Sequence, residues 1–263
     1  MIKIVTGTFS FGKKCLSLFL LFWLPILPMI LFLKHIDIEG PETVYDFFIK
    51  KGFKTKILEL QKGDRLPQSP KGFDAVVSLG GPMNVYEEDK YPFLAEEDKF
   101  IKQILKDEVP YLGICLGSQL LSKAAGSTVG KSSAKEVGFF YVDLNQNGMN
   151  DPLFKGLNQK FDVYHWHEDM FEIPENGKLL ASSPHCPHQA MRVGKNAYGL
   201  QFHVEITDKT IKEWTAEYFK ANDPQLIQKA NQMLADYQRI KKVFHQTADT
   251  IYENFLTIMK QTI

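Results

Sequence analysis

Cysteine is scarce in this chain of 263 residues, and neither sign of charge is in excess. The three cysteines, Cys15, Cys115 and Cys186, show no zinc-ligand spacing and are too few for a disulfide framework. Lysine plus arginine and aspartate plus glutamate both total 31, so net charge does not favour binding to nucleic acid or to an acidic membrane surface. The composition therefore disfavours a disulfide-rich or strongly basic protein, and a reducing, intracellular setting fits it best.

One long apolar run lies near the amino terminus. Residues 15–33 carry no charge and follow two lysines, which is typical of a membrane helix or a signal-anchor. Two prolines weaken such a helix, and no small-residue cleavage site follows it. Residues 29–36 also have the pattern of a first core strand, and one segment cannot both cross a bilayer and fill a sheet. We expect residues 1–28 to be an extension outside the fold, with a membrane anchor or a cleaved signal as alternatives.

Strand and helix patterns alternate in the first half of the chain. Apolar strands are expected at 29–36, 55–60, 74–79 and 111–114, and helices at 41–52, 93–106 and 116–125. Such βαβ alternation predicts a parallel sheet with right-handed crossovers. Ligands of these sheets bind at the carboxyl ends of strands, where Gly81 and Cys115 are expected.

The second half of the chain has shorter strand-like runs separated by turns, which predict antiparallel additions to the sheet. These runs cover about 137–144, 161–165, 178–182, 188–193 and 197–203. A helix is expected over 207–220, capped by Thr207, and a polar helical tail from Asp223 through Lys260. We expect the tail to pack on its own domain, with packing on a partner as the alternative. The predicted fold class is α/β, a mostly parallel open sheet flanked by helices.

The segment around Cys115 has the layout of a nucleophile elbow. The apolar strand 111–114 leads into Cys115, with Gly113 before it and Gly117 after it, and a helix start follows. Flanking glycines permit the strained, closely packed backbone of such a turn, and the helix N-terminus favours a thiolate. The alternative is that Cys115 is a small buried apolar residue.

A second segment favours the catalytic interpretation. The strand-like run 198–202 leads to His203, and Glu205 follows two residues later, on the same face of an extended chain. Glu205 can therefore orient the ring of His203 and stabilise its imidazolium form, as the acid of a triad does. The alternative is a surface ion pair.

Together these motifs resemble those of the class I (triad) glutamine amidotransferases, in particular stand-alone proteins similar to the glutaminase domain of GMP synthase. Gly-Ile-Cys-Leu-Gly-Ser-Gln at 113–119 and Gln-Phe-His-Val-Glu at 201–205 carry the resemblance. The segments 78–83 and 164–169 fall in the expected order, and the resemblance covers about residues 29–220. It implies a flavodoxin-like amidotransferase domain over 29–221 and a helical tail over 222–263, with Met29 as an alternative start.

The expected chemistry is attack by Cys115 on a side-chain amide, with proton transfer by His203 and orientation of that ring by Glu205. The backbone N–H groups of Gly81 and Leu116 are the candidate oxyanion donors. The resemblance implies that Gln119, Trp166 and His167 contact the substrate's amino-acid end.

Glu168 stands where the resembling domains have glycine, which affects the expected recognition of glutamine. The histidines at 165, 167, 185 and 188 show no defensible metal-ligand spacing with a cysteine or carboxylate. Neither a metal nor a cofactor is expected.

Three functions are consistent with these residues. The first is glutamine hydrolysis at Cys115 with ammonia passed to an acceptor, which requires a separate synthase subunit because about forty residues of tail cannot form one. The second is a stand-alone hydrolase of γ-glutamyl amides or peptides. The third is a non-catalytic binding protein on the same fold, which the intact Cys115, His203 and Glu205 set disfavours. We expect a cytoplasmic protein without a nucleic-acid partner, and a membrane partner only if residues 13–33 act as an anchor.

Overall fold

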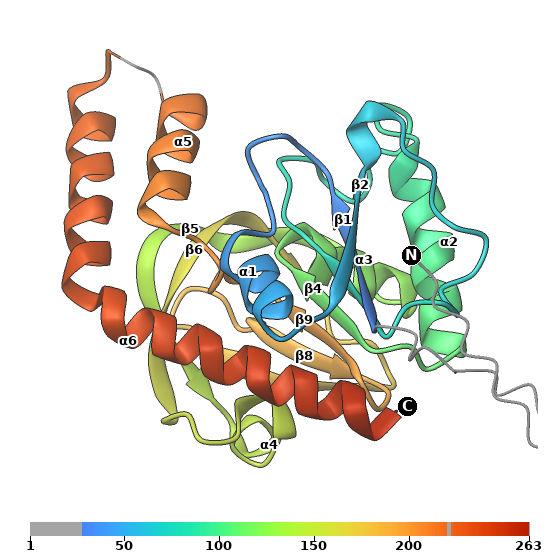
Figure 1. Ribbon diagram of the computed structural model, residues 1–263. Helices are drawn as coiled ribbons and strands as arrows, with labels where there is room; N and C mark the ends of the chain where they lie inside the picture. Colours follow the sequence, from blue (N-terminus) through green and yellow to red (C-terminus); the bar gives the residue numbers. More distant parts are fainter. Residues whose placement is uncertain (1–27, 220–221, 263) are drawn as a thin grey trace, which may run out of the picture.

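The computed structural model describes residues 28–219 and 222–262, which form one nine-stranded mixed sheet flanked by helices (Figure 1). The order of strands across the sheet is β2-β1-β3-β4-β9-β8-β7-β5-β6. The strands are β1 Met29–Lys34, β2 Lys54–Glu59, β3 Ala75–Ser78, β4 Tyr111–Ile114, β5 Val129–Leu144, β6 Lys160–Phe171, β7 Gly177–Ser182, β8 Ala190–Val193 and β9 Ala197–Leu200. The helices are α1 Glu42–Lys50, α2 Phe93–Lys106, α3 Leu116–Ala124, α4 Gln146–Met149, α5 Asp208–Tyr218 and α6 Pro224–Thr262. Two short 3-10 turns cover Leu60–Lys62 and Pro152–Phe154.

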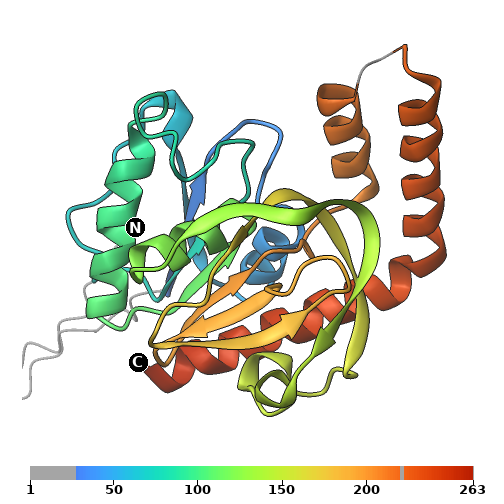
Figure 2. The same cartoon turned by 180° about the vertical axis from the view of Figure 1, so that it is seen from behind.

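The parallel part of the sheet contains β2, β1, β3, β4 and β9, and it confirms the predicted α/β fold class. Its inner strands are apolar and buried on both faces, as expected for strands covered by helices. α1 and the end of α6 pack on one face, while α2 and α3 pack on the other (Figures 1 and 2).

Residues 29–34 are used as β1, between β2 and β3, so this part of the amino-terminal apolar run fills the sheet. Residues 1–27 of the expected extension lie outside the described residues. None of the helices within 28–219 and 222–262 combines the length and hydrophobicity needed to cross a bilayer.

The antiparallel part differs from the prediction in two ways: β5 and β6 are longer than expected, and β9, expected among the antiparallel additions, pairs in parallel with β4 and so extends the parallel sheet. β5 has 16 residues and β6 has 12, and they form a long two-stranded ribbon that curls over the end of the sheet (Figure 2). The polar first half of β5 lacks an apolar alternation, so the pattern locates only its second half. Pairing with β6 supplies its hydrogen bonds, and the register shifts between Lys131 and Glu136, which re-aims the side chains there.

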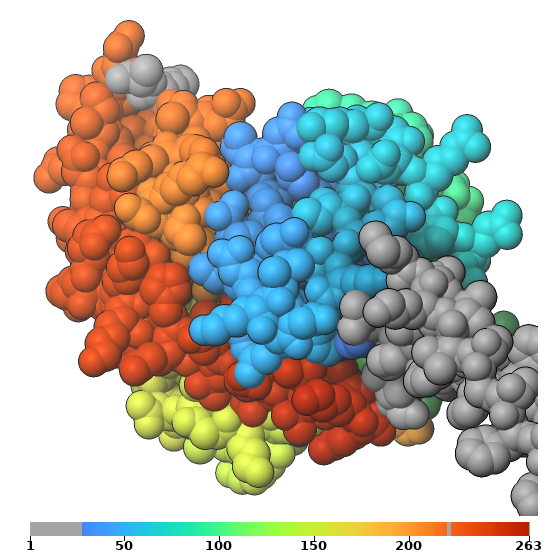
Figure 3. Space-filling model, in the orientation of Figure 1, coloured from blue at the N-terminus to red at the C-terminus, as the bar shows by residue number. Residues whose placement is uncertain are grey.

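Helix α6 is 39 residues long and crosses the whole molecule. Its first part runs beside α5, and its second part lies below α1, where its side chains form a continuous band in the space-filling view (Figure 3). Residues of that second part, including Ile251, Tyr252 and Phe255, are fully buried in the core under α1. The tail is therefore an integral layer of the fold, as expected for packing on its own domain.

Candidate active site

Cys115 lies at the carboxyl end of β4, in the sharp turn that begins α3. Its backbone has φ 51° and ψ −105°, a strained conformation for a residue with a side chain. A Cβ on Gly113 would overlap the backbone of Gly117, and a Cβ on Gly117 would overlap the backbone of Ser78. Glycine at both positions is thus required by the close packing of β3, β4 and α3, and this turn has the geometry of the predicted elbow.

The N–H group of Leu116 is available beside Cys115. Among the first N–H groups of α3, Gly117 donates to the carbonyl of Leu79, while Ser118 and Gln119 donate to that of Cys115. The N–H of Leu116, at the helix start, has no intrahelical acceptor. Gly81 is next to it, because a Cβ on Gly81 would lie 2.9 Å from Leu116 Cδ2. The structure therefore packs Gly81 against Leu116, the residue after the cysteine, and Gly81 lines the same cavity as Cys115.

His203 and Glu205 are buried together beside Cys115. His203 Nδ1 lies 2.6 Å from Glu205 Oε1, and the other carboxylate oxygen accepts the backbone N–H of Val204 at 2.9 Å. The ring packs edge-on against Trp214, with 4.9 Å between the centroids. Burial opposes ionisation of the ring, but the Glu205 carboxylate and the Cys115 thiol together raise the pKa of His203 well above its ordinary value. The three predicted catalytic residues are thus assembled in one place.

Polar groups from three other segments surround the Cys115 sulfur. The thiol faces the carbonyl of Trp166 at 4.0 Å, and Gln201 Nε2 faces the sulfur at 3.8 Å. Gln119 is buried and donates to Gln201 Oε1 at 3.2 Å and to the carbonyl of Asp169 at 3.3 Å. Gln201 was present in the sequence motif without a predicted role, and here it links Gln119 to the cysteine.

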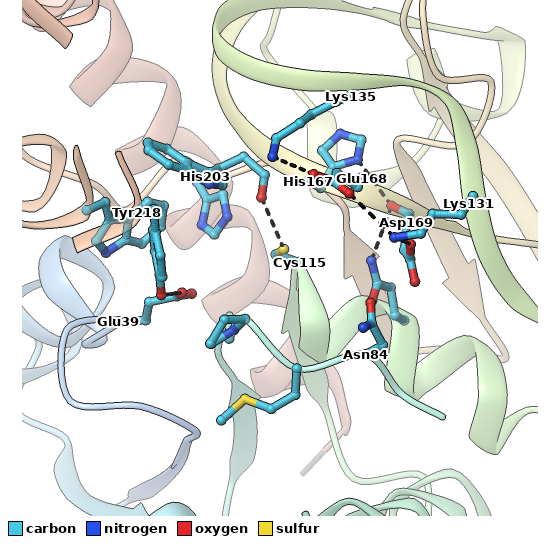
Figure 4. Close-up of a pocket in the computed structure, with 16 residues that line it drawn as sticks. Glu39, Asn84, Cys115, Lys131, Lys135, His167, Glu168, Asp169, His203 and Tyr218 are labelled. Atoms are coloured by element: carbon cyan, nitrogen blue, oxygen red, sulfur yellow. Dashed lines mark hydrogen bonds and ion pairs between the residues drawn. The ribbon is translucent and has the colours of Figure 1, made fainter. Parts of the chain in front are cut away.

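A cavity of about 370 Å³ opens above these groups (Figure 4). It extends to both sides of Cys115: Lys131 and Asp169 lie on one side, and Glu39 and Tyr218 on the other. It contains four of the predicted site residues besides Cys115 and His203, namely Gly81, Gln119, Trp166 and His167. The remaining lining residues are Glu39, Pro82, Met83, Asn84, Lys131, Lys135, Glu168, Asp169, Trp214 and Tyr218.

The rim on the β5–β6 side is highly charged. Glu168 pairs with Lys135 and, at 3.5 Å, with Lys131, and the hydrogen bond from Lys135 lowers the pKa of Glu168. Lys131 also lies 2.9 Å from Asp169 Oδ1, and Tyr86 donates to Asp169 Oδ2 at 2.9 Å. Glu168 thus points to the rim and forms ion pairs there. Sequence reasoning did not identify the two lysines, because the irregular β5–β6 register places them at the cavity.

The opposite side of the cavity contains a buried acid that sequence reasoning also missed. Glu39, in the loop after β1, is 7% exposed and accepts a hydrogen bond from Tyr218 at 2.9 Å. Burial raises the pKa of Glu39, while His203 and Tyr218 oppose this effect. In the sequence, the one feature that marks Glu39 is its position between the first strand and the Gly40-Pro41 turn.

A buried ion pair supports the loop that carries Gly81. His35 donates through Nδ1 to the carbonyl of Gly80 at 3.0 Å, and its Nε2 lies 2.7 Å from Glu97 Oε2. Ser78 donates to the other oxygen of Glu97 at 2.7 Å. Burial opposes the charge on His35, but Glu97 raises its pKa. This network fixes the backbone next to the predicted oxyanion donor.

Three of the histidines that show no metal-ligand spacing along the sequence meet a carboxylate in the fold. His188 Nδ1 lies 3.3 Å from Glu172 Oε2, and His165 and His167 lie beside Glu136. β5 pairs Glu136 directly with His167, and nitrogen and oxygen atoms of Glu136, His165 and His167 all lie within 4.8 Å of one another. These residue types are able to bind a divalent metal ion. However, Glu136 already accepts hydrogen bonds from Ser183 at 2.8 Å and Gln189 at 2.6 Å, so protein groups satisfy the carboxylate.

The chain is similar in sequence to known glutamine amidotransferases and to part of GMP synthases. The family model described as glutamine amidotransferase class-I matches residues 39–221. The glutamine amidotransferase-like protein YfeJ of Salmonella typhimurium strain LT2 is 31% identical over 210 residues, which cover 79% of this chain and 83% of that protein. The GMP synthase of Thermosipho melanesiensis is 38% identical over 135 residues, which cover 51% of this chain but 24% of the synthase.

Solved structures show the same relationship. The crystal structure of a glutamine amidotransferase from Thermotoga maritima superposes with a TM-score of 0.78 and 33% identity, covering 87% of this chain and 97% of that one. A glutamine amidotransferase from Methylobacillus flagellatus, at 23% identity, shares the fold with a TM-score of 0.79.

Proposed function

Because this chain belongs to the class-I glutamine amidotransferase family, we propose that it hydrolyses the side-chain amide of glutamine at Cys115. The observation that carries this proposal is the meeting of an elbow cysteine at positive φ with the buried His203–Glu205 pair in a single cavity. Gln119, Trp166 and His167, which line that cavity, are the proposed contacts for the amino-acid end of the substrate.

In the proposed first step, the Cys115 sulfur attacks the amide carbon and a C–S bond forms. The negative charge that develops on the carbonyl oxygen is stabilised by the N–H groups of Leu116 and Gly81, each such donor being typically worth about 3 kcal/mol. His203 holds the proton of the thiol and transfers it to the departing nitrogen, so the C–N bond breaks and ammonia leaves a glutamyl thioester. Glu205 keeps the ring oriented through the 2.6 Å contact.

In the second step, water replaces ammonia beside His203. His203 takes a proton from the water, the resulting hydroxide attacks the thioester carbon, and the C–S bond breaks to release glutamate and restore the thiol. Cys115, His203 and Glu205 are only 7%, 1% and 3% exposed, so the charged intermediates are stabilised mainly by protein groups and not by bulk water.

The ammonia requires an acceptor if the chain acts as an amidotransferase. The Thermosipho GMP synthase, the glutamine-hydrolysing enzyme compared above, is about four times longer than its alignment with this chain. We therefore propose that a separate synthase subunit, of unknown substrate, receives the ammonia. Such a subunit would dock where the cavity opens.

A stand-alone γ-glutamyl amide or peptide hydrolase is the second candidate. The continuation of the cavity past His203 to Glu39 and Tyr218 favours it, because ammonia as a leaving group has no substituent to occupy that space. In this case water is the acceptor and no partner is needed.

The proposal is tested by measuring glutamate release from glutamine by the full chain and by Cys115→Ser. The matched control is Cys186→Ser, which changes a buried cysteine outside the cavity whose pKa burial raises to about 11. We expect release by the wild type and by Cys186→Ser and none by Cys115→Ser. A glutamine-like diazoketone should add covalently to Cys115 in the same samples, as measured by mass spectrometry. Folded wild-type protein that neither releases glutamate nor is labelled would contradict the proposal.

A further inference from the structure

The part of the cavity beyond His203 has no role in the hydrolysis of glutamine itself. Its walls are Glu39, Trp214 and Tyr218, which come from the loop after β1 and from α5. Trp166 of β6 lies between this end and Cys115, because its carbonyl faces the thiol while its ring packs against Trp214 and Tyr218. In Figure 4, Glu39 and Tyr218 lie on the opposite side of Cys115 and His203 from Lys131 and Asp169. The two ends of the cavity are therefore chemically different, and the catalytic groups lie between them.

Glu39 is held firmly at this end. Tyr218 donates to Glu39 Oε1 at 2.9 Å, and the other oxygen lies against the backbone of Gly80, where any Cβ would overlap it. A Cβ on Gly80 would also lie 3.1 Å from His203 Cε1. The Glu39 carboxylate and the His203 ring therefore both lie close to the backbone of Gly80. The acid is thus buried beside the residue that handles the proton, but it contacts neither ring nitrogen among the described hydrogen bonds.

Aromatic rings complete the walls. Trp166 lies with its ring centroid 6.0 Å from that of Trp214, at 90°, and 5.6 Å from that of Tyr218. Trp214 is fixed by its own N–H bond to the carbonyl of Ile38 at 3.0 Å. Aromatic faces next to a carboxylate bind alkylammonium groups well, through cation–π attraction and ion pairing. The Glu39 carboxylate disfavours a second carboxylate at this end, because like charges repel strongly in a partly dry site.

The chemistry of the reaction decides which part of a substrate reaches this end. His203 must give its proton to the leaving nitrogen, so any substituent on that nitrogen extends to the His203 side of Cys115. The α-amino and α-carboxylate groups of the glutamyl part then lie at the other end, among the charges of Lys131 and Asp169. We propose that Glu39 and its aromatic neighbours form a leaving-group site for the distal ammonium of a γ-glutamyl amide of an aliphatic diamine.

The reaction balances as an ordinary hydrolysis. The amide C–N bond breaks as the thioester C–S bond forms, the proton held by His203 moves to the nitrogen, and the diamine leaves. Water then cleaves the thioester to glutamate and free thiol. This inference rests on the proposed hydrolysis at Cys115 and specifies its substrate class.

The test compares four substrates with the full chain: glutamine and the γ-glutamyl amides of 1,4-diaminobutane, butylamine and 4-aminobutyrate. The three amides have similar length and place a positive, a neutral and a negative group at the distal end. We expect kcat/KM to fall in that order, by at least tenfold from the first to the last. Glu39→Gln should bring the diaminobutane and butylamine values to within about twofold of each other, because it removes the carboxylate charge that pairs with the distal ammonium.

Controls keep a folding defect from being mistaken for a specificity change. Tyr218→Phe removes the hydrogen bond to Glu39 and should reduce the preference without abolishing it, while Glu175→Gln, on an exposed residue outside the cavity, should leave it unchanged. The readout is a ratio of rates on one protein sample, which partial unfolding does not alter.

The outcomes separate this inference from the proposed function. If glutamine is hydrolysed but the wild type does not prefer the diaminobutane amide, or if Glu39→Gln keeps the preference, the leaving-group site is wrong and the hydrolysis at Cys115 stands. If no substrate is hydrolysed and Cys115 is not labelled by the diazoketone, both are overturned.

Discussion

The hydroxyl groups of Tyr252 and Thr43 lie 3.0 Å apart and connect the C-terminal helix to the candidate active site. Thr43 in turn donates to the carbonyl of Glu205, through its hydroxyl at 2.9 Å and its N–H at 3.2 Å. These hydrogen bonds hold the backbone of Glu205 against α1, and the Tyr252 contact helps to hold α1 against α6. A helix outside the family match thus supports the segment that orients His203.

Replacing Tyr252 by phenylalanine should remove this connection while leaving the ring in the core. Tyr252 is fully buried, and loss of the bond leaves Thr43 with one partner fewer, so we expect the free energy of unfolding to fall by about 1 kcal/mol. Urea denaturation measures the change. Tyr141→Phe, on a side chain that is 40% exposed, is the matched control and should change stability by less than about 0.5 kcal/mol. Equal effects of the two variants would show that the Thr43 contact contributes nothing.

The elbow should not tolerate a methyl group at Gly117. A Cβ there would overlap the backbone of Ser78, so β3 or α3 must shift. We expect Gly117→Ala to lower the free energy of unfolding by about 1–3 kcal/mol and to reduce glutaminase activity by about 100-fold, because Cys115 moves with α3. Gly72→Ala, where an added Cβ has nothing within 4 Å, should change neither quantity. Wild-type activity in Gly117→Ala would contradict the close packing described for the elbow.

Stability should be greatest near pH 6–7, because buried histidines titrate in opposite directions. Burial lowers the pKa of His165 to about 3, so its neutral form stabilises the fold above the unfolded pKa of about 6.5, and this contribution is lost as the pH falls from about 6.5 towards 3. His203 has a raised pKa, since Glu205 and Cys115 outweigh burial, so its contribution is present below about 6.5 and is lost as the pH rises through the raised pKa. His35 acts in the same direction as His203.

The two limbs of this profile can be assigned separately by urea denaturation between pH 4 and pH 9. His165→Phe should flatten the acid limb, and Glu205→Gln should flatten the alkaline limb because it removes a carboxylate that raises the pKa of His203. His185→Phe, on an exposed histidine, should alter neither limb. An acid limb that is unchanged in His165→Phe would assign it to carboxylates instead.

The parts of the candidate site that the sequence predicted are those carried by local motifs. Cys115 follows an apolar strand and precedes a helix, and His203 and Glu205 share one short extended segment, so their mutual placement follows from strand geometry and spacing. Gly81 ends a neighbouring parallel strand, whose carboxyl end must lie at the same edge of the sheet.

The residues that were missed are brought to the site by long-range pairing. Lys131 and Lys135 reach the rim through an irregular register between two long strands, and Glu136 meets His167 through the same ribbon. Glu39 meets Tyr218 only because α5 returns over the loop after β1. Spacing along the chain carries no information about such contacts, and the polar first half of β5 showed no strand periodicity to indicate them.

The lysines at the rim should determine how tightly glutamine binds. Lys131 and Lys135 are the cations that line the described cavity, at the end where we place the α-carboxylate of the substrate. Their side chains are 63% and 55% exposed, so solvent screening reduces the gain, and we expect Lys135→Met to raise KM for glutamine by about fivefold with kcat within twofold. Lys160→Met, which removes an exposed lysine paired with Asp143 outside the cavity, is the matched control.

Glu168→Gln should act in the opposite direction at the same rim. It removes the carboxylate that pairs with both lysines, so Lys135 loses its ion pair with Glu168 while Lys131 keeps the one with Asp169. The charge of Lys135 then becomes available to the substrate, so KM for glutamine should fall below the wild-type value. Both KM effects should shrink as salt rises from about 0.05 to 0.5 M, because the shorter Debye length screens the attraction between exposed charges more strongly. A change in kcat at constant KM, or an effect of Lys160→Met equal to that of Lys135→Met, would instead place the substrate's α-carboxylate away from these lysines.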